Sequence, residues 1–165
     1  MRVAGFSAES VVDGPGIRMV LFAQGCPHGC AECHNMDSWD CTGGYTLSVD
    51  DISKLIKKSH AHKQGVTFSG GEPFDQAGEL LELVPVIREL GLDLWAYSGY
   101  TYEELVKDVH SVQYQLLCQL DVLVDGRYVH DLREMGLAFC GSSNQRLIAV
   151  RESLARGGVV LWEKG

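Results

Sequence analysis

The sequence predicts an α/β fold, an incomplete, open (β/α) barrel of about five or six strand–helix units. Short apolar runs typical of strands alternate with stretches whose apolar residues recur at helical spacing. Such alternation favours parallel strands joined by crossover helices. The chain has 165 residues, whereas a closed eight-unit barrel takes about 250, so only part of a barrel can form. The candidate chemical motifs all follow predicted strands, at the end where such folds carry their chemistry.

The composition indicates one globular domain over residues 1–165. Apolar residues make up 45% of the chain, and the apolar runs are much shorter than the ~20 residues that cross a bilayer. The formal charge of −8 argues against nucleic-acid binding, because proteins that bind nucleic acids carry a basic face. No basic-then-apolar leader is visible at the N-terminus. We therefore expect a cytoplasmic protein that spans no membrane and keeps its thiols reduced.

The first half of the chain contains three predicted strands and one predicted helix. Residues 2–5 predict a short edge strand, and residues 13–16 have the composition of a turn. The apolar run 17–23 predicts a strand buried on both faces, as in a parallel sheet. Ser48 is the predicted N-cap of a helix that has acids in its first turn. Residues 66–69 predict the next strand.

The second half continues the alternation. Asp75 is the predicted cap of a helix that runs to about Leu90, and Pro85 should kink this helix or end its first half. Gly91 suits the C-terminal cap, and Thr101 opens another predicted helix. The remaining predicted strands are residues 92–97, 121–125, 146–150 and 159–162.

Cys26, Cys30 and Cys33 follow an apolar predicted strand at C-x3-C-x2-C spacing. Thiolates are soft ligands that suit iron–sulfur clusters or zinc, and a short loop can direct all three at one point. Three ligands are one fewer than a closed site uses, so the spacing suggests a cluster with one open iron. Zinc is the alternative, with His28 or His34 as a fourth ligand. A disulfide framework fits less well, because nothing in the sequence indicates secretion.

Segments on either side of the cysteine loop favour the cluster. Asp-Gly-Pro-Gly-Ile-Arg occupies residues 13–18, His-Asn follows the third cysteine, and Ser-Gly-Gly-Glu-Pro occupies residues 69–73 after a predicted strand. With the triad, these segments resemble the radical S-adenosylmethionine enzymes, and more narrowly the activases of glycyl-radical enzymes. Asp-Gly-Arg at 125–127 and Gly-Ser-Ser-Asn-Gln at 141–145 extend the resemblance over most of the chain. The triad combined with residues 69–73 is the most specific part.

The resemblance implies a [4Fe–4S] cluster held by the three cysteines and S-adenosylmethionine bound at its open iron. It implies that the backbone of Gly70 and Gly71 approaches the ammonium group of the ligand, with a carboxylate added by Glu72. Taken alone, this stretch would be an ordinary strand-to-helix turn. No catalytic residue is expected beyond the cluster ligands. The remaining expected cofactor-binding positions are Ser69, Ser98, Asp125 and Arg127. Ser98 is expected there because it follows a predicted strand, and a surface salt bridge is the alternative role for Arg127.

The resemblance also implies a protein substrate, a glycine of the large subunit of an anaerobic ribonucleotide reductase, and a reductant of the flavodoxin or ferredoxin type. The short chain, which has no second cysteine cluster, favours this partner over pyruvate formate-lyase. We expect the partner to contact residues 13–18, including Arg18, and the rim beyond Gly141. The alternatives are a small-molecule radical enzyme of the deazaguanine synthase type and a non-catalytic iron–sulfur or zinc module. Three other cysteines lack ligand spacing and are expected to be ordinary thiols: Cys41, Cys118 and Cys140.

Overall fold

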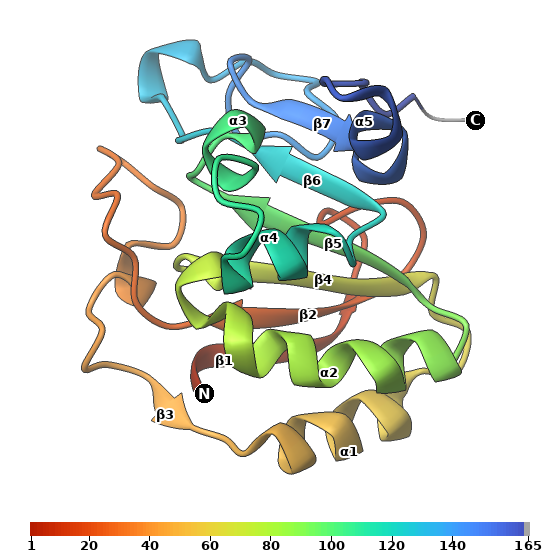
Figure 1. Cartoon of the computed structure of the whole chain (residues 1–165). Coiled ribbons are helices and arrows are strands. Elements are labelled where there is room, and N and C mark those ends of the chain that lie inside the picture. The colour runs from red at the N-terminus through yellow and green to blue at the C-terminus, as the bar shows by residue number, and fades with distance from the viewer. Residues whose placement is uncertain (164–165) are drawn as a thin grey trace.

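The computed structural model describes residues 1–163, which form one mixed β-sheet with helices packed against it (Figure 1). The strand order across the sheet is β3-β1-β2-β4-β5-β6-β7. The strands are β1 (Arg2–Ser10), β2 (Arg18–Ala23), β3 (Tyr45–Thr46), β4 (Gly65–Gly70), β5 (Asp93–Ser98), β6 (Val122–Asp125) and β7 (Arg146–Ala149). The α/β fold predicted from the alternating pattern is thereby confirmed.

The helices alternate with the central strands. They are α1 (Val49–Ser59), α2 (Ala77–Glu89), α3 (Tyr102–Leu105), α4 (Val112–Leu117) and α5 (Val150–Arg156), with single 3-10 turns at η1 (Met36–Ser38), η2 (Pro73–Gln76) and η3 (His130–Leu132). The Ser48 hydroxyl accepts a hydrogen bond from the Asp51 amide at 3.0 Å, which confirms the predicted cap. None of these helices, all within residues 1–163, is long and apolar enough to cross a membrane.

Four neighbouring strands, β2, β4, β5 and β6, run parallel. The strands that flank these four, β1 and β7, pair antiparallel with β2 and β6. The described part of the chain therefore has fewer parallel units than the about five or six expected. The reason lies in residues 126–145, which leave β6 and return to the same end of the sheet without a crossover helix. A strand that follows such a return must run antiparallel.

Three predicted elements differ from those in the structure. β1 has nine residues and lies between β2 and β3, so it is not a short edge strand. Helix α2 starts after η2 and continues through Pro85. Pro85 is exposed, so water can bond the carbonyl that loses its backbone donor. Residues 159–162 lie beside β7 but pair with it only through one bridge, between Ile148 and Leu161, and through hydrogen bonds from the Ala149 amide to the Val160 carbonyl at 2.9 Å and from the Trp162 amide to the Leu147 carbonyl at 2.8 Å.

The two faces of the sheet have different coverings. Leu94 and Ala96 of β5 point into the main core, which lies under α1, α2 and α4. The intervening Trp95 and Tyr97 point to the opposite face, because successive strand residues alternate sides. Trp95 packs there against Trp162, with ring centroids 5.0 Å apart. This second face carries only a small apolar cluster, and space is left beside that cluster.

Arg18 closes this second face near the start of the parallel strands. Its side chain is fully buried and pairs with Asp93 at 2.5 Å. Its Nε also donates to the Thr67 hydroxyl at 2.8 Å, and its guanidinium lies 5.2 Å from the Trp95 ring centre. The expectation that Arg18 contacts a partner protein is therefore wrong. Alternation along β2 turns this side chain into the protein interior, where Thr67, the Val66 carbonyl and Asp93 bind its Nε and one of its terminal nitrogens.

Arg18→Met should destabilise the fold, because it leaves Asp93 and Thr67 without their buried partner. We expect the free energy of unfolding to fall by about 3 kcal/mol, measured by denaturant titration of the metal-free protein. Asp50→Asn is the control, since it removes an exposed pair with Lys54 and should leave the unfolding midpoint unchanged. A stable Arg18→Met variant would show that the buried contacts carry little energy.

Candidate functional site

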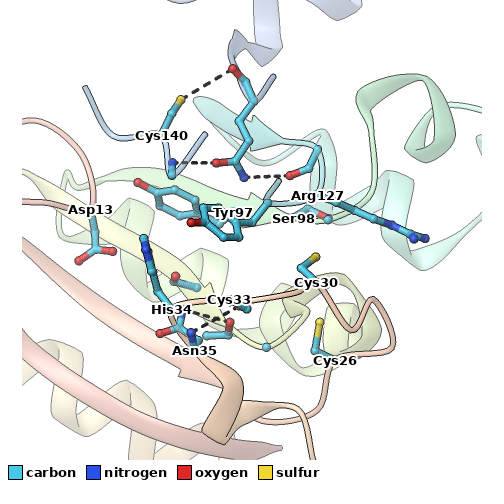
Figure 2. A pocket seen from close by; sticks show the side chains of 18 of the residues that line it. Asp13, Cys26, Cys30, Cys33, His34, Asn35, Tyr97, Ser98, Arg127 and Cys140 are labelled. Atoms are coloured by element: carbon cyan, nitrogen blue, oxygen red, sulfur yellow. Dashed lines mark hydrogen bonds between the residues drawn. The ribbon is translucent and has the colours of Figure 1, made fainter. Parts of the chain in front are cut away.

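A cavity of about 710 Å³ lies on the second face of the sheet, at the carboxyl ends of the parallel strands (Figure 2). Phe22 of β2, Ser69 of β4 and Tyr97 of β5 line it, and all three side chains belong to the face without the main core. Figure 2 shows Cys26 and Cys30 on one side of this cavity and Asp13 on the opposite side. The motifs predicted at strand ends are thus brought to one place.

The three cysteines of the triad all line the cavity as free thiols. Burial raises the pKa of Cys26 above its usual value, and the amide of His28 acts in the opposite direction. Burial also raises the pKa of Cys30, opposed by the amide of Tyr128 and the charge of Arg127. A metal centre bound by these residues would displace the thiol protons, because thiolates are the ligands.

The cysteine loop is fastened to neighbouring backbone on both sides. The Gly25 amide donates to the Ser38 carbonyl at 2.7 Å, and the Cys26 amide donates to the Trp39 carbonyl at 3.1 Å. After the triad, the Asn35 amide donates to the Cys33 sulfur at 3.4 Å. Glu32 has a φ of 54°, a left-handed conformation that lets the loop turn between its last two cysteines. The sulfur positions therefore follow from the backbone path.

Gly70 and Gly71 allow the ends of β2 and β4 to come together. A Cβ on Gly70 would lie 2.5 Å from the Ala23 carbonyl oxygen, and one on Gly71 would lie 2.2 Å from the Gly25 carbonyl oxygen. The Gly71 amide also donates to the Ala23 carbonyl at 2.8 Å. Both glycines line the cavity. Their missing side chains thus serve strand-end packing as well as access to a ligand.

The structure brings most of the predicted cofactor-binding residues to the cavity, but not all. Besides the cysteines, the predicted residues that line it are Ser69, Gly70, Gly71, Ser98 and Arg127. Glu72 and Asp125 are almost completely buried and do not line it. For these two residues the expectation of direct ligand contact does not agree with the geometry.

Glu72 is surrounded by donors that use both of its carboxylate oxygens. Oε1 accepts from the Ser98 hydroxyl at 2.9 Å and from the Phe74 amide at 3.0 Å. Oε2 accepts from the Gly99 amide at 2.8 Å and is bonded to His28 Nε2 at 2.8 Å. A carboxylate with no exposed surface and four hydrogen bonds is directed into the protein. Sequence spacing alone cannot show this orientation.

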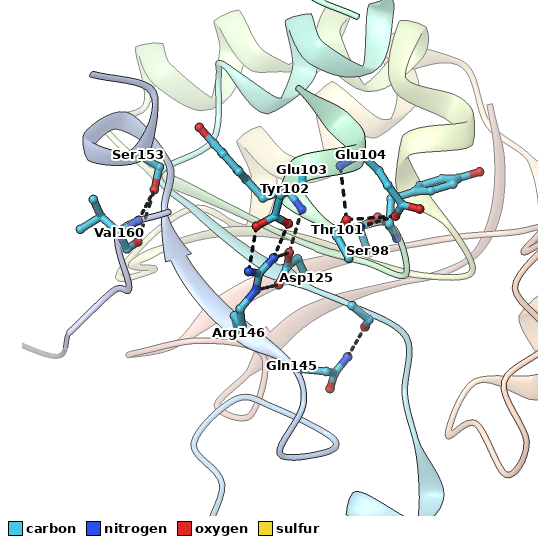
Figure 3. A network of polar contacts seen from close by, with 12 residues as sticks. Ser98, Thr101, Tyr102, Glu103, Glu104, Asp125, Gln145, Arg146, Ser153 and Val160 are labelled. Carbon is cyan, nitrogen blue, oxygen red and sulfur yellow. Dashed lines mark hydrogen bonds and ion pairs between the residues drawn. The ribbon is translucent and has the colours of Figure 1, made fainter. Parts of the chain in front are cut away.

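Asp125 is the buried member of a second polar network, beside the cavity rather than in it (Figure 3). It accepts from the Tyr102 amide at 2.7 Å and pairs with Arg146 at 2.5 Å. Arg146 also pairs with Glu103 at 2.7 Å, and the hydrogen bond to Asp125 is the main cause of its raised pKa. This network joins the end of β6 and the start of β7 to the start of α3.

Residues 141–145 close the base of the 126–145 excursion. The Gln145 side chain accepts from the Gly141 amide at 2.8 Å and donates to the Gly126 carbonyl at 2.9 Å. Asn144 donates to the Arg127 carbonyl at 2.9 Å. Arg127 and Cys140 both belong to this excursion and line the cavity. Burial raises the pKa of Cys140 to about 11, so this thiol is neutral near pH 7.

Sequence reasoning missed several residues that line the cavity. Tyr97 donates from its hydroxyl to the Phe139 carbonyl at 2.8 Å and so ties β5 to the excursion. Tyr128 packs against His34, with ring centroids 5.1 Å apart. The position of Tyr97, one residue before a strand end, could have indicated from the sequence that it lines the cavity. The contact of Tyr128 with His34 could not be predicted, because it joins residues far apart in the sequence.

The residues present fit an iron–sulfur cluster with an amino-acid ligand beside it. Three soft sulfur donors line one cavity, and the Gly70 and Gly71 backbone lines the adjoining wall. Within residues 1–163, no group of three or more His, Cys, Asp or Glu side chains is gathered closely enough to hold one metal ion. The arginines that form ion pairs in this range are Arg18, Arg88, Arg146 and Arg151, so Arg127 keeps its guanidinium available.

Comparisons with known proteins identify the family of this chain. Residues 12–148 match the protein family described as "4Fe-4S single cluster domain". A protein from Salmonella typhi is 35% identical over 152 residues, which cover 88% of this chain and 96% of the relative. Relatives from Escherichia coli K12 (37% identity, 82% of this chain and 90% of the relative) and from Enterobacteria phage T4 (33% identity, 82% and 86%) cover nearly as much. All three are named anaerobic ribonucleoside-triphosphate reductase-activating protein, and this chain belongs to that family.

Proposed function

We propose that this protein is a radical S-adenosylmethionine activase that installs a glycyl radical on an anaerobic ribonucleoside-triphosphate reductase. The observation that carries the proposal is the placement of all three cysteines of the triad in one cavity with the Gly-Gly backbone. Near full-length relatives with the activator name support it. When bound, the cluster would supply the electron that splits S-adenosylmethionine into methionine, which leaves, and a 5′-deoxyadenosyl fragment, which would take a hydrogen atom from the glycine.

The residues of this chain bind the cluster and orient S-adenosylmethionine beside it. Cys26, Cys30 and Cys33 hold the cluster and leave one iron open. The backbone of Gly70 and Gly71 provides polar groups for the ammonium of the ligand. The exposed guanidinium of Arg127 is suited to a carboxylate, which it can bind through two parallel hydrogen bonds.

Ser69 and Ser98 are buried hydroxyls at the ends of β4 and β5, and both line the cavity. We assign them to the ligand wall, with Ser98 oriented by its bond to Glu72. We also propose that the curved sheet is an incomplete barrel of the radical S-adenosylmethionine type. The parallel strands that end at one cavity support this proposal. The open side would admit a glycine segment of the reductase, and a flavodoxin or ferredoxin type protein would supply the electron.

Replacing any one of Cys26, Cys30 and Cys33 by Ala should abolish cluster binding after anaerobic reconstitution, because two thiolates cannot retain the cluster. Iron and sulfide content and visible absorbance measure this loss. The matched control is one triple variant in which the three other cysteines, Cys41, Cys118 and Cys140, become Ser. This variant should keep a full cluster. A full cluster in any single triad variant would contradict the ligand assignment, as would stoichiometric zinc in place of iron.

Gly71→Ala should reduce iron retention and weaken S-adenosylmethionine binding together. The added methyl group would lie 2.2 Å from the Gly25 carbonyl oxygen, so the start of the cysteine loop must move. Gly78→Ala in α2 is the control, because no atom lies within 4 Å of its Cβ position and Ala favours the helix. Normal iron content and normal ligand affinity in Gly71→Ala would separate this glycine from the site.

The protein should generate a glycyl radical on the large subunit of the anaerobic reductase from its own source. The test mixes the two proteins with S-adenosylmethionine and a reductant without oxygen, and records the electron paramagnetic resonance (EPR) spectrum. Cys30→Ala is the negative control. A radical formed only on a pyruvate formate-lyase from the same source would overturn the partner. Absence of S-adenosylmethionine cleavage by cluster-loaded protein would overturn the activity itself.

A further inference from the structure

The side chain of His28 joins the cysteine loop to the buried Glu72. His28 lies midway between Cys26 and Cys30, and its Nε2 is 2.8 Å from Glu72 Oε2. The exposed fractions of the two side chains are 3% and 0%, so the contact is shielded from water. A carboxylate only accepts hydrogen bonds, which places the imidazole proton on Nε2. No other side chain between Cys26 and Cys33 makes a buried polar contact within residues 1–163.

Close packing fixes the orientation of the His28 ring. A Cβ on Gly99 would lie 2.2 Å from the ring, so the backbone at the end of β5 packs directly on the imidazole. The Tyr100 ring meets it edge-on, with centroids 4.6 Å apart. The Gly99 amide donates to the same Glu72 oxygen that His28 contacts. One buried carboxylate thus ties the cysteine loop to the ends of both β4 and β5.

We propose that Glu72 and His28 are positioning residues, which act through each other to hold the Cys26–Cys30 segment and so fix how the cluster is bound and held. The inference rests on the cluster of the proposed function and replaces the expectation that Glu72 touches the ligand. Groups that orient metal ligands from outside commonly change metal affinity about 10- to 100-fold when removed. A hydrogen bond shielded from water is stronger than an exposed one, so it can hold the cysteine loop in place.

The opposing interpretation is that Glu72 only stabilises the fold, through Phe74, Ser98 and Gly99. The two interpretations differ in what His28 contributes. If Glu72 serves the fold alone, losing the His28 bond lowers the unfolding midpoint of the metal-free protein and leaves the bound cluster unchanged. If the pair positions the loop, the cluster itself responds.

The test compares His28→Phe, which keeps a ring but loses the donor, with His28→Gln, which keeps an N–H donor at similar reach. The readouts are the rate of iron loss to a chelator, the EPR spectrum of the reduced cluster, and the unfolding midpoint of the metal-free protein. We expect iron loss from His28→Phe to be about tenfold faster, with a broadened EPR spectrum. His28→Gln should restore most of both properties.

His130→Phe is the matched control. It removes another histidine–carboxylate contact to the cysteine loop, the 3.2 Å pair with Glu32, in which both side chains are largely exposed. The rate of iron loss should stay within about twofold of the rate for the parent protein, because exposed ion pairs contribute little stabilising free energy. Equal acceleration in His130→Phe and His28→Phe would overturn the special role of the buried pair.

Glu72→Gln combined with His28→Phe tests whether the two residues act through each other. If the two residues act through each other, the double variant loses iron no faster than the more affected single variant. Additive effects would overturn the proposal, as would iron loss and EPR spectra like the parent in His28→Phe. These measurements involve no partner protein or S-adenosylmethionine, so a failure of the proposed activase function would appear separately, in the radical assay.

Discussion

The close approach of the ends of β2 and β4 is the constraint on which the site depends. The Gly71 amide reaches the Ala23 carbonyl and the Glu72 amide reaches the Gly25 carbonyl, each at 2.8 Å. These bonds extend the parallel pairing past the last ladder residues and into the first turn of the cysteine loop. Only a residue without a Cβ permits this distance at position 71. The sulfur-bearing loop and the Gly-Gly wall are therefore parts of one rigid junction.

The buried carboxylates at the strand ends, Glu72 in this junction and Asp125 of β6, are balanced by protein groups rather than by solvent. Glu72 receives four hydrogen bonds, and Asp125 is neutralised by Arg146. Burying a carboxylate costs several kcal/mol unless its oxygens are satisfied, so each network must form completely or not at all. Such all-or-none networks suit a site whose ligands must be held in place before a cofactor arrives.

The sequence could predict the strand ends and the cysteine triad, because apolar periodicity and short-range spacing are local properties. Ser69, Gly70, Gly71 and Arg127 were predicted through the resemblance and Ser98 from its place at a predicted strand end, and all five line the cavity. The roles of Arg18, Glu72 and Asp125 could not be predicted in this way. Their side chains find partners from other strands, and a polar residue at a strand end looks the same whether it faces the cavity or the interior. The antiparallel return of β7 depends likewise on a long excursion without periodicity.

The excursion between β6 and β7 is fixed at its base and open at its tip. Asn144 and Gln145 bond the backbone of Arg127 and Gly126, and the Ser143 amide reaches the Leu132 carbonyl at 2.8 Å. Beyond these bonds the Met135 side chain is 99% exposed. Extra residues inserted just before Met135 would leave the hydrogen bonds at the base in place, whereas the residues after it, from Leu137 to Phe139, line the cavity. The N-terminal side of this tip is therefore a suitable place for a fluorescent label or an affinity tag that reports on assembly without disturbing the chemistry.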